Sequence, residues 1–355
     1  MEINSEANSA PSAIIDKALR TAMSAGWEVR GTTSPNPPVG AVMVSTAGEI
    51  VGTGATQPAG GAHAEVQALA EAVGRTDGAT AVVTLEPCRH TGRTGPCTQA
   101  LIEAGIQEVY YLHSDPNPEA GGGAEALREA GVNVTQLSAP EGMPDALIPW
   151  LKSVQLGRPH VTLKFAQTID GFTAAADGTS QWITGEMARQ YVHEDRAHRD
   201  AIIIGTGTAL TDNPSLTARF PDGSQREHQP RRVVIGRRRL ADVGENASNL
   251  NRLGFEQYAK IDEALQELYA SGARDVLVEG GAGLASGFMN AGLVDWVQVY
   301  QAPLLLGEGI SVLAHPLTNT LKGAARFSRG QVVALGDDLL INYVRVPRNA
   351  SPHKP

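Results

Sequence analysis

The residues of this sequence best suited to chemistry are one histidine, one glutamate and two cysteines in its first hundred positions. His63 and Glu65 are separated by one residue, and eight residues separate Cys88 from Cys97, the two cysteines of the chain. An imidazole and two thiolates suit Zn²⁺, and three protein ligands leave the fourth tetrahedral position open to water. The ligand set therefore predicts a catalytic zinc site that performs hydrolysis.

Zinc makes hydroxide available at neutral pH, but the reaction still needs a side chain that moves protons. Glu65 is the candidate, because it lies two residues from a ligand and could carry a proton from water to the departing amine. A His-x-Glu followed by Pro-Cys is typical of zinc deaminases of nucleosides and nucleobases, although the gap between the cysteines is longer here. The alternative is a structural zinc site with His90 as the fourth ligand.

These residues need secondary structure that holds them together. Hydrophobic periodicity predicts strands over residues 39–44, 80–85 and 108–112, and helices over residues 64–72 and 96–104, the second with proline in its first turn. His63 and Cys97 then lie where helices begin, so free N–H groups and the helix dipole favour a thiolate and a developing oxyanion.

The rest of the chain continues the alternation of helices and strands that is typical of an α/β protein. Four prolines interrupt the pattern between residues 138 and 159, which predicts a boundary near residue 157 and domains over 1–157 and 158–355. In the first domain we also expect helices over 14–25 and 124–130 and a strand over 132–137. In the second we expect strands over 160–166, 201–204, 232–235, 275–278, 297–305 and 339–346, and helices over 186–197, 261–270 and 284–291.

Composition excludes several classes of function. The 355 residues carry 38 acidic and 29 basic side chains, a formal net charge of −9, which disfavours binding to nucleic acid or to an anionic membrane. The first ten residues are polar, and no run of about 20 apolar residues follows, so we expect neither a signal peptide nor a membrane span. Two cysteines in one short segment fit a reducing cytoplasm.

Several longer motifs resemble those of the bifunctional deaminase/reductase family of riboflavin biosynthesis. In the first half they are SPNPPVG at 34–40, HAEV at 63–66, TLEPCRHTGRTGPC at 84–97 and DPNP at 115–118. In the second half they are PHVTLK at 159–164, TIDG at 168–171, SQWIT at 180–184, GTGT at 205–208 and DNPSLT at 212–217. The eight-residue gap between the cysteines matches this family, and the resemblance spans residues 12–347.

The resemblance implies a cytidine-deaminase-like α/β/α domain followed by a dihydrofolate-reductase-like α/β domain that uses NADPH. The first domain would hydrolyse the 2-amino group of 2,5-diamino-6-ribosylamino-4(3H)-pyrimidinone 5′-phosphate, and the second would reduce the ribosyl chain to ribityl. Zinc would be held by His63, Cys88 and Cys97, with Glu65 transferring protons. The implied contacts to the pyrimidine and its ribose phosphate are Asn36, His90, Arg93, Asp115 and Asn117.

In the second half the resemblance implies a cofactor site and a substrate site. The cofactor contacts would be Ala166, Trp182, Thr208, Asp212 and the turn formed by Gly281, Ala282, Gly283, Leu284, Ala285, Ser286 and Gly287. The substrate contacts would be Ser180, Arg196, Leu216, Arg219 and Glu279, with the arginines near the 5-phosphate and the catalytic Lys164 near the sugar carbon that accepts hydride.

From the residue types alone, several of these implied site residues could instead have a purely structural role. The glycine-rich turn after a strand could admit a diphosphate at a helix N-terminus or only allow close packing. Trp182 could be core, Arg196 a solvated helix face, and Glu279 a helix N-cap partner. Asn36 and Asn117 precede prolines and could serve as turn residues.

Arg237, Arg238 and Arg239 follow a predicted strand, and their guanidinium groups could bind the 2′-phosphate that distinguishes NADPH from NADH. An exposed basic loop is the alternative. For the whole protein the rival functions are a nucleobase or nucleic-acid deaminase, a structural zinc module without turnover, and a protein that keeps only one of the two activities. We further expect a small-molecule substrate, no nucleic-acid or membrane partner, and a cytoplasmic homo-oligomer.

Overall fold

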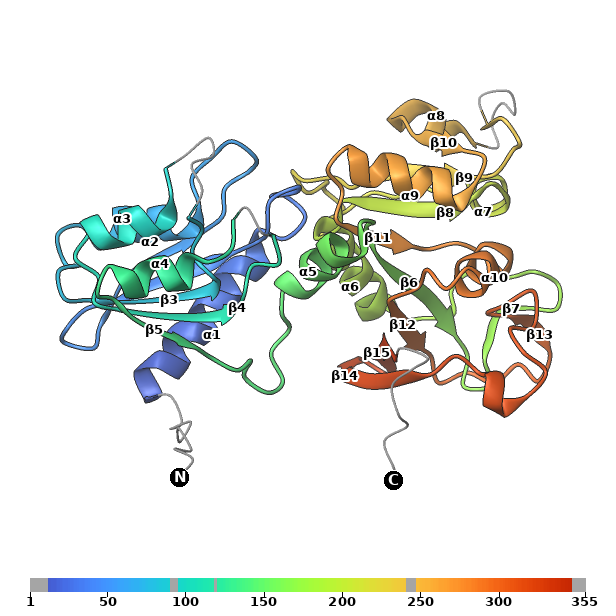
Figure 1. Cartoon of the computed structure of the whole chain (residues 1–355). Helices are drawn as coiled ribbons and strands as arrows, with labels where there is room; N and C mark the ends of the chain where they lie inside the picture. Colours follow the sequence, from blue (N-terminus) through green and yellow to red (C-terminus); the bar gives the residue numbers. More distant parts are fainter. Residues whose placement is uncertain (1–11, 90–94, 118–119, 241–246, 347–355) are drawn as a thin grey trace. The chain divides into compact units, whose positions relative to one another are not determined.

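The computed structural model describes residues 12–89, 95–117, 120–240 and 247–346 (Figure 1). The chain divides into two compact units, with the division between Gln155 and Leu156. Each unit has its own sheet and its own hydrophobic core, so each is described by itself.

The first unit is built on a five-stranded sheet with the order β2-β1-β3-β4-β5. Its strands are β1 (Gly40–Val44), β2 (Ile50–Ala55), β3 (Thr80–Leu85), β4 (Glu108–His113) and β5 (Asn133–Gln136). β1 runs antiparallel to β2 and β3, whereas β3, β4 and β5 are parallel. The carboxyl ends of β3 and β4 therefore meet at one edge, which places the residues after Leu85 beside those after His113.

Helices cover both faces of this sheet. They are α1 (Ala13–Glu28), α2 (Ala64–Ala72), α3 (Cys97–Glu103), α4 (Gly123–Glu129) and α5 (Leu147–Leu156). On one face α1 packs against Val42, Val44 and Val82. On the other face the intervening strand residues form a core with α2, α3, α4 and α5. The alternation of strand side chains between two helix layers gives the predicted α/β/α arrangement.

The second unit contains an eight-stranded sheet with the order β10-β9-β8-β11-β6-β12-β15-β14. Its strands are β6 (His160–Gln167), β8 (Ala201–Gly205), β9 (Arg231–Ile235), β10 (Glu256–Tyr258), β11 (Asp275–Val278), β12 (Trp296–Gln301), β14 (Phe327–Leu335) and β15 (Asp338–Arg345). The first six strands in spatial order are parallel, and β15 and β14 are antiparallel additions at one edge. A short ribbon pairs β7 (Phe172–Ala175) with β13 (Gly309–Ser311).

The helices of this unit are α6 (Glu186–Ala197), α7 (Thr206–Asp212), α8 (Ser248–Leu253), α9 (Ile261–Ala270) and α10 (Ala282–Asn290), with a short 3₁₀ turn at Leu321–Gly323. α9 and α10 cover one face of the sheet in the main apolar core. α6 lies over the opposite face, where Ala188 packs with Tyr300, Leu335 and Leu340.

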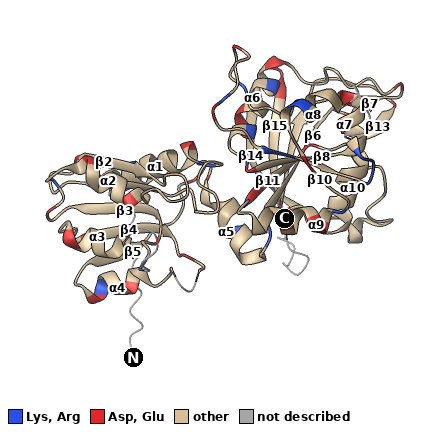
Figure 2. Cartoon of the chain, turned by 90° about the horizontal axis from the view of Figure 1, so that it is seen from above, with Lys and Arg blue, Asp and Glu red and all other residues tan. Residues whose placement is uncertain are grey.

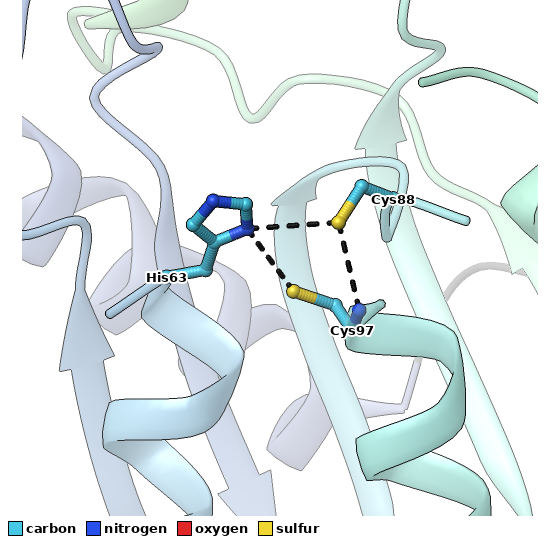
Figure 3. A group of neighbouring side chains, drawn as sticks. All are labelled: His63, Cys88 and Cys97. Carbon is cyan, nitrogen blue, oxygen red and sulfur yellow. Dashed lines mark hydrogen bonds between the residues drawn. The ribbon is translucent and has the colours of Figure 1, made fainter. Parts of the chain in front are cut away.

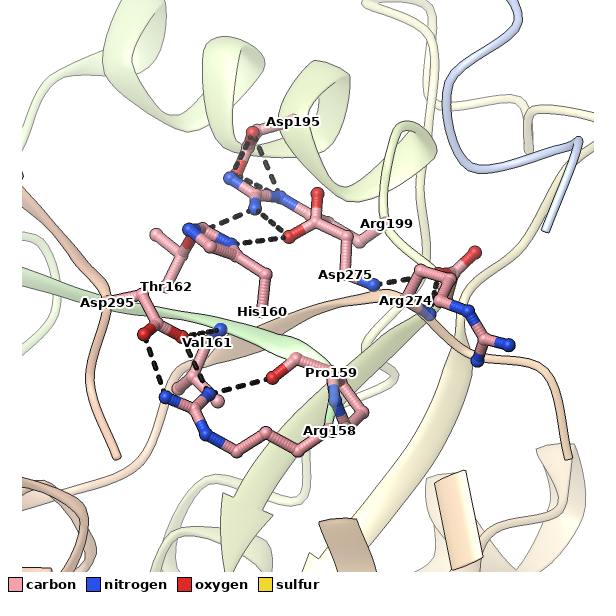
Figure 4. A network of polar contacts seen from close by, with 11 residues as sticks. Arg158, Pro159, His160, Val161, Thr162, Asp195, Arg199, Arg274, Asp275 and Asp295 are labelled. Carbon is pink, nitrogen blue, oxygen red and sulfur yellow. Dashed lines mark hydrogen bonds and ion pairs between the residues drawn. The ribbon is translucent and has the colours of Figure 1, made fainter. Parts of the chain in front are cut away.

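A buried ionic network ties together the amino ends of the central strands (Figure 4). Arg199, 1 % exposed, donates to Asp195 at 2.8 Å and to Asp275 at 3.0 Å. The carboxylate of Asp275 also lies 3.1 Å from His160 Nδ1 at the start of β6. Because β6, β8 and β11 are parallel and begin at this end, the network fixes the relative positions of strands whose opposite ends carry the predicted reductase residues.

The structure differs from the sequence prediction at several elements. β2, β7, β10, β13, β14, α7 and α8 are present although no element was predicted there. The strand predicted over 297–305 is wrong at its end, because β12 stops at Gln301. Ala302 N donates to Gln167 O at the end of β6 at 2.9 Å, and Leu304 O accepts from Ile169 N, in the loop after β6, at 2.8 Å.

Candidate functional site

His63, Cys88 and Cys97 come together although they lie in different parts of the first unit (Figure 3). Cys97 begins α3, His63 is the residue before α2, and Cys88 follows the end of β3. The three ligand atoms all lie within 4.8 Å of one another. His63 Nδ1 is 3.2 Å from Cys97 Sγ and 3.6 Å from Cys88 Sγ.

This geometry fits a tetrahedral zinc ion. With Zn–S near 2.3 Å and Zn–N near 2.0 Å, tetrahedral angles place a nitrogen and a sulfur ligand about 3.5 Å apart. The two measured separations, 3.2 and 3.6 Å, lie on either side of that value. Three donors of the right chemistry and spacing thus converge, and among the described residues no fourth His, Cys, Asp or Glu joins the group.

The surroundings of Cys88 favour its thiolate form. Hydrogen bonding from the Cys97 thiol, together with contacts to His63, lowers the pKa of Cys88 to about 4. The backbone N–H of Cys97 also donates to Cys88 Sγ at 3.5 Å. Because the two sulfurs share a proton, the same contact raises the pKa of Cys97. The second thiol proton is the one that a bound cation must displace.

Glu65 lies in the first turn of α2, beside the ligand His63, and is 4 % exposed. Burial raises the pKa of its carboxyl to about 7. A carboxyl with this pKa exchanges its proton near neutral pH, which is the property required of a group that accepts and then returns a proton.

The loops assigned to the pyrimidine substrate are only partly described. Asn36 lies in a turn in which its backbone N–H donates to the backbone carbonyl oxygen of Thr33 at 3.0 Å. Asp115 follows β4 and accepts from Asn117 N at 2.8 Å. His90 and Arg93 lie outside the described residues, so the possible fourth-ligand role of His90 is not addressed by the structure.

Glu86 was not singled out from the sequence, yet it connects the parts of this site. Its buried carboxylate accepts from Ala124 N at 2.9 Å and from Asp115 N at 3.3 Å. It thereby ties the turn that carries Cys88 to the start of α4 and to the loop after β4. A carboxylate that directly follows a buried strand was the available signal, because such a charge is rarely buried without a partner.

In the second unit three predicted residues meet at the carboxyl ends of β6 and β11. Arg196 donates to both oxygens of Glu279, through Nε at 2.8 Å and Nη2 at 2.9 Å, and Lys164 Nζ lies 3.7 Å from Glu279 Oε2. Although burial opposes ionisation of Glu279, the charges of Arg196 and Lys164 lower its pKa to about 2. Burial lowers the pKa of Lys164. The alternative readings of Arg196 as a solvated face and Glu279 as a helix cap partner are therefore wrong.

Two of the predicted cofactor residues also touch each other. The backbone N–H of Gly281, at the start of α10, donates to Thr208 Oγ1 at 3.1 Å. Ala166 lies near the carboxyl end of β6, and Asp212 ends α7. In α10 the side chains of Ala285 and Ser286 are buried, whereas Gly281 and Gly283 are exposed.

The remaining predicted residues are more dispersed. Trp182 is 68 % exposed, which contradicts its alternative reading as core, and its ring lies 4.7 Å from the Arg189 guanidinium. No hydrogen bond or ion pair among the described residues joins Ser180 or Trp182 to the Lys164 group. Leu216 is buried next to Thr217, whose hydroxyl accepts from Arg219 Nε at 2.8 Å.

Comparison with known proteins matches each half of the chain to a protein family. Residues 13–113 match the cytidine and deoxycytidylate deaminase zinc-binding region, and residues 159–341 match the RibD C-terminal domain. The riboflavin biosynthesis protein RibD of Corynebacterium ammoniagenes is 83 % identical over 92 % of this chain and 96 % of its own length. RibD of Mycobacterium tuberculosis H37Rv is 46 % identical over 93 % of this chain and 97 % of its own length. The chain belongs to the RibD family.

Solved structures of RibD proteins agree with this assignment. The Acinetobacter baumannii RibD structure has a TM-score of 0.80 at 33 % identity and covers 94 % of this chain and 99 % of its own. The Thermotoga maritima protein, described as a diaminohydroxyphosphoribosylaminopyrimidine deaminase and 5-amino-6-(5-phosphoribosylamino)uracil reductase, has a TM-score of 0.81 at 31 % identity, with the same coverage. The predicted fold classes, cytidine-deaminase-like and then dihydrofolate-reductase-like, are confirmed.

This RibD family member is a bifunctional enzyme of riboflavin biosynthesis, with a zinc-binding deaminase domain and a reductase domain. No helix in the described part of the chain has the length and hydropathy needed to cross a membrane.

Proposed function

We propose that the first domain hydrolyses the 2-amino group of 2,5-diamino-6-ribosylamino-4(3H)-pyrimidinone 5′-phosphate. The second domain then reduces the ribosyl chain with NADPH to give 5-amino-6-ribitylamino-uracil 5′-phosphate. The observation that carries this proposal is the convergence of His63, Cys88 and Cys97 beside the buried Glu65. The deaminase and reductase activities by which the Thermotoga maritima relative is described support the same pair of reactions.

In the deaminase domain His63, Cys88 and Cys97 would hold the zinc ion, which when bound supplies a Lewis acid that makes water nucleophilic at neutral pH. Glu65 accepts the proton of the attacking water and gives it to a ring nitrogen of the substrate, and it then passes a second proton, from the hydroxyl group added to the ring, to the leaving amine. Asn36 offers a donor and an acceptor to the pyrimidine edge, and Asp115 and Asn117 line the same substrate. We assign His90 and Arg93 to the phosphate end.

In the reductase domain NADPH, when bound, supplies the hydride. Lys164 lies beside the sugar carbon that is reduced and provides a proton to the sugar, to which its lowered pKa is suited. Glu279 keeps Lys164 and Arg196 in place through two charged contacts. Arg196 and Arg219 hold the 5-phosphate, with Ser180 and Leu216 completing the substrate contacts.

The cofactor would be held by the carboxyl-end loops of the sheet. The contact between Gly281 N and Thr208 Oγ1 supports one site formed by the starts of α7 and α10, where free N–H groups suit a diphosphate. The other contacts of this proposed cofactor site are Ala166, Trp182, Asp212, Ala282, Gly283, Leu284, Ala285, Ser286 and Gly287.

We also propose that Arg237 and Arg238 bind the 2′-phosphate of NADPH. Both are exposed and follow the carboxyl end of β9, next to β8 in the sheet. Replacing both by Ser should raise the KM for NADPH about tenfold or more and leave the KM for NADH nearly unchanged, because a lost charged contact is worth about 1.5–3 kcal/mol. An unchanged ratio of the two KM values would refute this assignment.

The decisive experiment is incubation of the purified zinc-loaded protein with the diaminopyrimidinone phosphate, first without and then with NADPH. Ammonia should be released in the first stage, and absorbance of the reduced cofactor should fall only in the second. A protein that releases no ammonia but unfolds when zinc is chelated would have a structural site instead. Ammonia release without NADPH oxidation would leave only the deaminase half of the proposal.

We place the enzyme in the cytoplasm, which is supported by two cysteines that must remain reduced to bind metal. We further propose a homo-oligomer, supported by Val332 and Leu339, exposed by 46 % and 40 % on one face of the β14–β15 hairpin. Light scattering of the purified protein measures this directly, and a monomeric mass would refute it.

A further inference from the structure

Three side chains with basic nitrogens converge on one residue of the reductase domain, Thr217. His193 Nδ1 lies 2.9 Å from the Thr217 carbonyl oxygen, which Arg196 Nη1 also approaches at 3.2 Å. Arg219 Nε donates to the hydroxyl of the same threonine at 2.8 Å. The preceding residue, Leu216, has a φ of 49°, which turns the chain sharply at this point.

The contact with Thr217 fixes the tautomer of His193. A carbonyl oxygen only accepts, so Nδ1 must carry a hydrogen, and Nε2 is the nitrogen left for a ligand. Nε2 makes no hydrogen bond to the described residues. His193 also lies three positions before Arg196 on α6, so both side chains project from one face of the helix.

The two arginines alone leave the proposed phosphate site short of charge and of donors. Arg196 has five N–H donors, of which three are directed to Glu279 and Thr217. Glu279 carries one negative charge and also faces Lys164, which is assigned to the sugar carbon, so it offsets the charge of Arg196 only in part. Arg219 and the remaining charge of Arg196 therefore face a group that carries nearly two negative charges at pH 7.

We propose that His193 is a further substrate-binding residue of the reductase site, and that its Nε2 takes up a proton to bind the 5-phosphate of the substrate. The new protein-bound proton comes from solvent, and no covalent bond to the substrate forms or breaks. This inference rests on the proposed reductase function and adds to it a proton-coupled phosphate contact.

The charges facing His193 explain why the proton arrives with the ligand. Burial, and next the positive charge of Arg196 on α6, lower the pKa of His193; the Thr217 carbonyl and Glu279 after β11 oppose them, and Arg219 beyond α7 adds a smaller lowering effect. The imidazole is consequently neutral at pH 7 in the free protein. A phosphate dianion at Nε2 raises the pKa of His193 in the complex. The added affinity is therefore complete below the pKa of His193 in the free protein and is lost as pH rises through its pKa in the complex.

Two substitutions of His193 distinguish a phosphate contact from a purely structural role. In His193→Asn the side-chain amide can still donate to the Thr217 carbonyl as Nδ1 does, but nothing replaces Nε2. In His193→Gln an uncharged amide reaches toward the Nε2 position. Calorimetric titration of each protein with the deaminated, phosphorylated substrate in the presence of NADP⁺ measures affinity without turnover, in two buffers of different ionisation enthalpy and from pH 5.5 to 8.5.

On binding the ligand near pH 7 the wild-type protein should take up protons beyond the uptake of the phosphate itself. His193→Asn should bind about tenfold more weakly below pH 7 and lose this proton uptake, because a hydrogen bond to a charged group is worth about 1.5–3 kcal/mol. His193→Gln should recover part of the affinity but not the proton uptake. The dephosphorylated substrate should bind all three proteins equally.

Equal affinity and equal proton uptake in the wild type and His193→Asn would overturn the inference. So would a loss of affinity that is the same with and without the phosphate. Tight binding without NADPH-dependent turnover in the wild type would instead count against the proposed reductase reaction. Retained NADP⁺ binding shows that each variant is folded.

Discussion

At Glu65 the same burial that makes a charge costly also gives the carboxyl a useful proton affinity. The side chain is 4 % exposed and its pKa is raised to about 7. By contrast, Glu279, whose side chain is 8 % exposed, has two cationic neighbours, which lower its pKa to about 2 although burial opposes its ionisation. Burial therefore assigns no role by itself; the charges next to each carboxyl decide whether it transfers a proton or holds cations in place.

Glu65→Gln should lower kcat for ammonia release by about 10²–10⁴-fold, because the amide cannot accept and return a proton. Zinc content, measured by elemental analysis, should stay at the wild-type level. Reduction of the separately prepared deaminated intermediate should be unaffected. Loss of both activities would contradict two independent sites, and substantial residual ammonia release would remove Glu65 from the mechanism.

The sequence predicted ligand types well, but not their local partners. His63, Cys88 and Cys97 could be selected because few residue types bind zinc and each lies near a predicted helix or strand end. Glu86 and His193 were not selected, because their partners are backbone groups of segments 29 and 24 positions away. Such contacts depend on which loops a fold brings together, and hydrophobic periodicity carries no information about that.

At the scale of elements, glycines decide how closely the layers approach. At Gly52 and Gly54 in β2 an added Cβ would lie 2.1 and 2.2 Å from backbone oxygens of α2. These glycines also explain why β2 was not predicted, because Ile-Val-Gly-Thr-Gly-Ala lacks the alternation of a half-buried strand. β14 was missed for a related reason, since most of its residues are exposed and Gly330 interrupts them.

Gly123 gives a direct test of such an approach. It begins α4, and a Cβ there would lie 1.7 Å from the carbonyl oxygen of Pro87, next to Cys88. Gly123→Ala should therefore lower the free energy of unfolding of the deaminase domain by about 1–3 kcal/mol and reduce its zinc affinity. Gly95→Ala is the control, because a Cβ at Gly95 meets no atom of the described residues within 4 Å. Equal chemical denaturation midpoints for the two variants would contradict the packing argument.

At the scale of the molecule, no hydrophobic cluster of the described residues contains side chains of both units. Each unit should therefore have its own free energy of unfolding. Acidic and basic side chains are interspersed over both units (Figure 2). The chain offers a matched pair of (i, i+4) contacts: Arg199 with Asp195 is buried, whereas Arg20 with Asp16 is about 45 % exposed. The alternation of elements predicted two domains, but only the structure identifies which charges are enclosed.

Arg199→Met should destabilise the reductase domain by about 3–5 kcal/mol, because Asp195 and Asp275 would remain buried without their cation. Ammonia release should be retained. Arg20→Met removes an exposed pair of the same spacing and should change stability by no more than about 1 kcal/mol. Thermal unfolding followed together with both activities measures these effects, and equal destabilisation by the two substitutions would refute the assignment.

The borders of the two sheets bear on the behaviour of the protein at high concentration. β10 has three residues and β5 has four. The edge strand β2 has six, and its pairing with β1 shifts register between Met43 and Val44, while the pairing of β14 is interrupted between Arg329 and Val332. Unpaired strand borders can recruit other chains into fibrous aggregates when they are long and regular. Short or interrupted borders offer no extended template, so the protein should remain dispersed in a crowded cell even though its sheets are open.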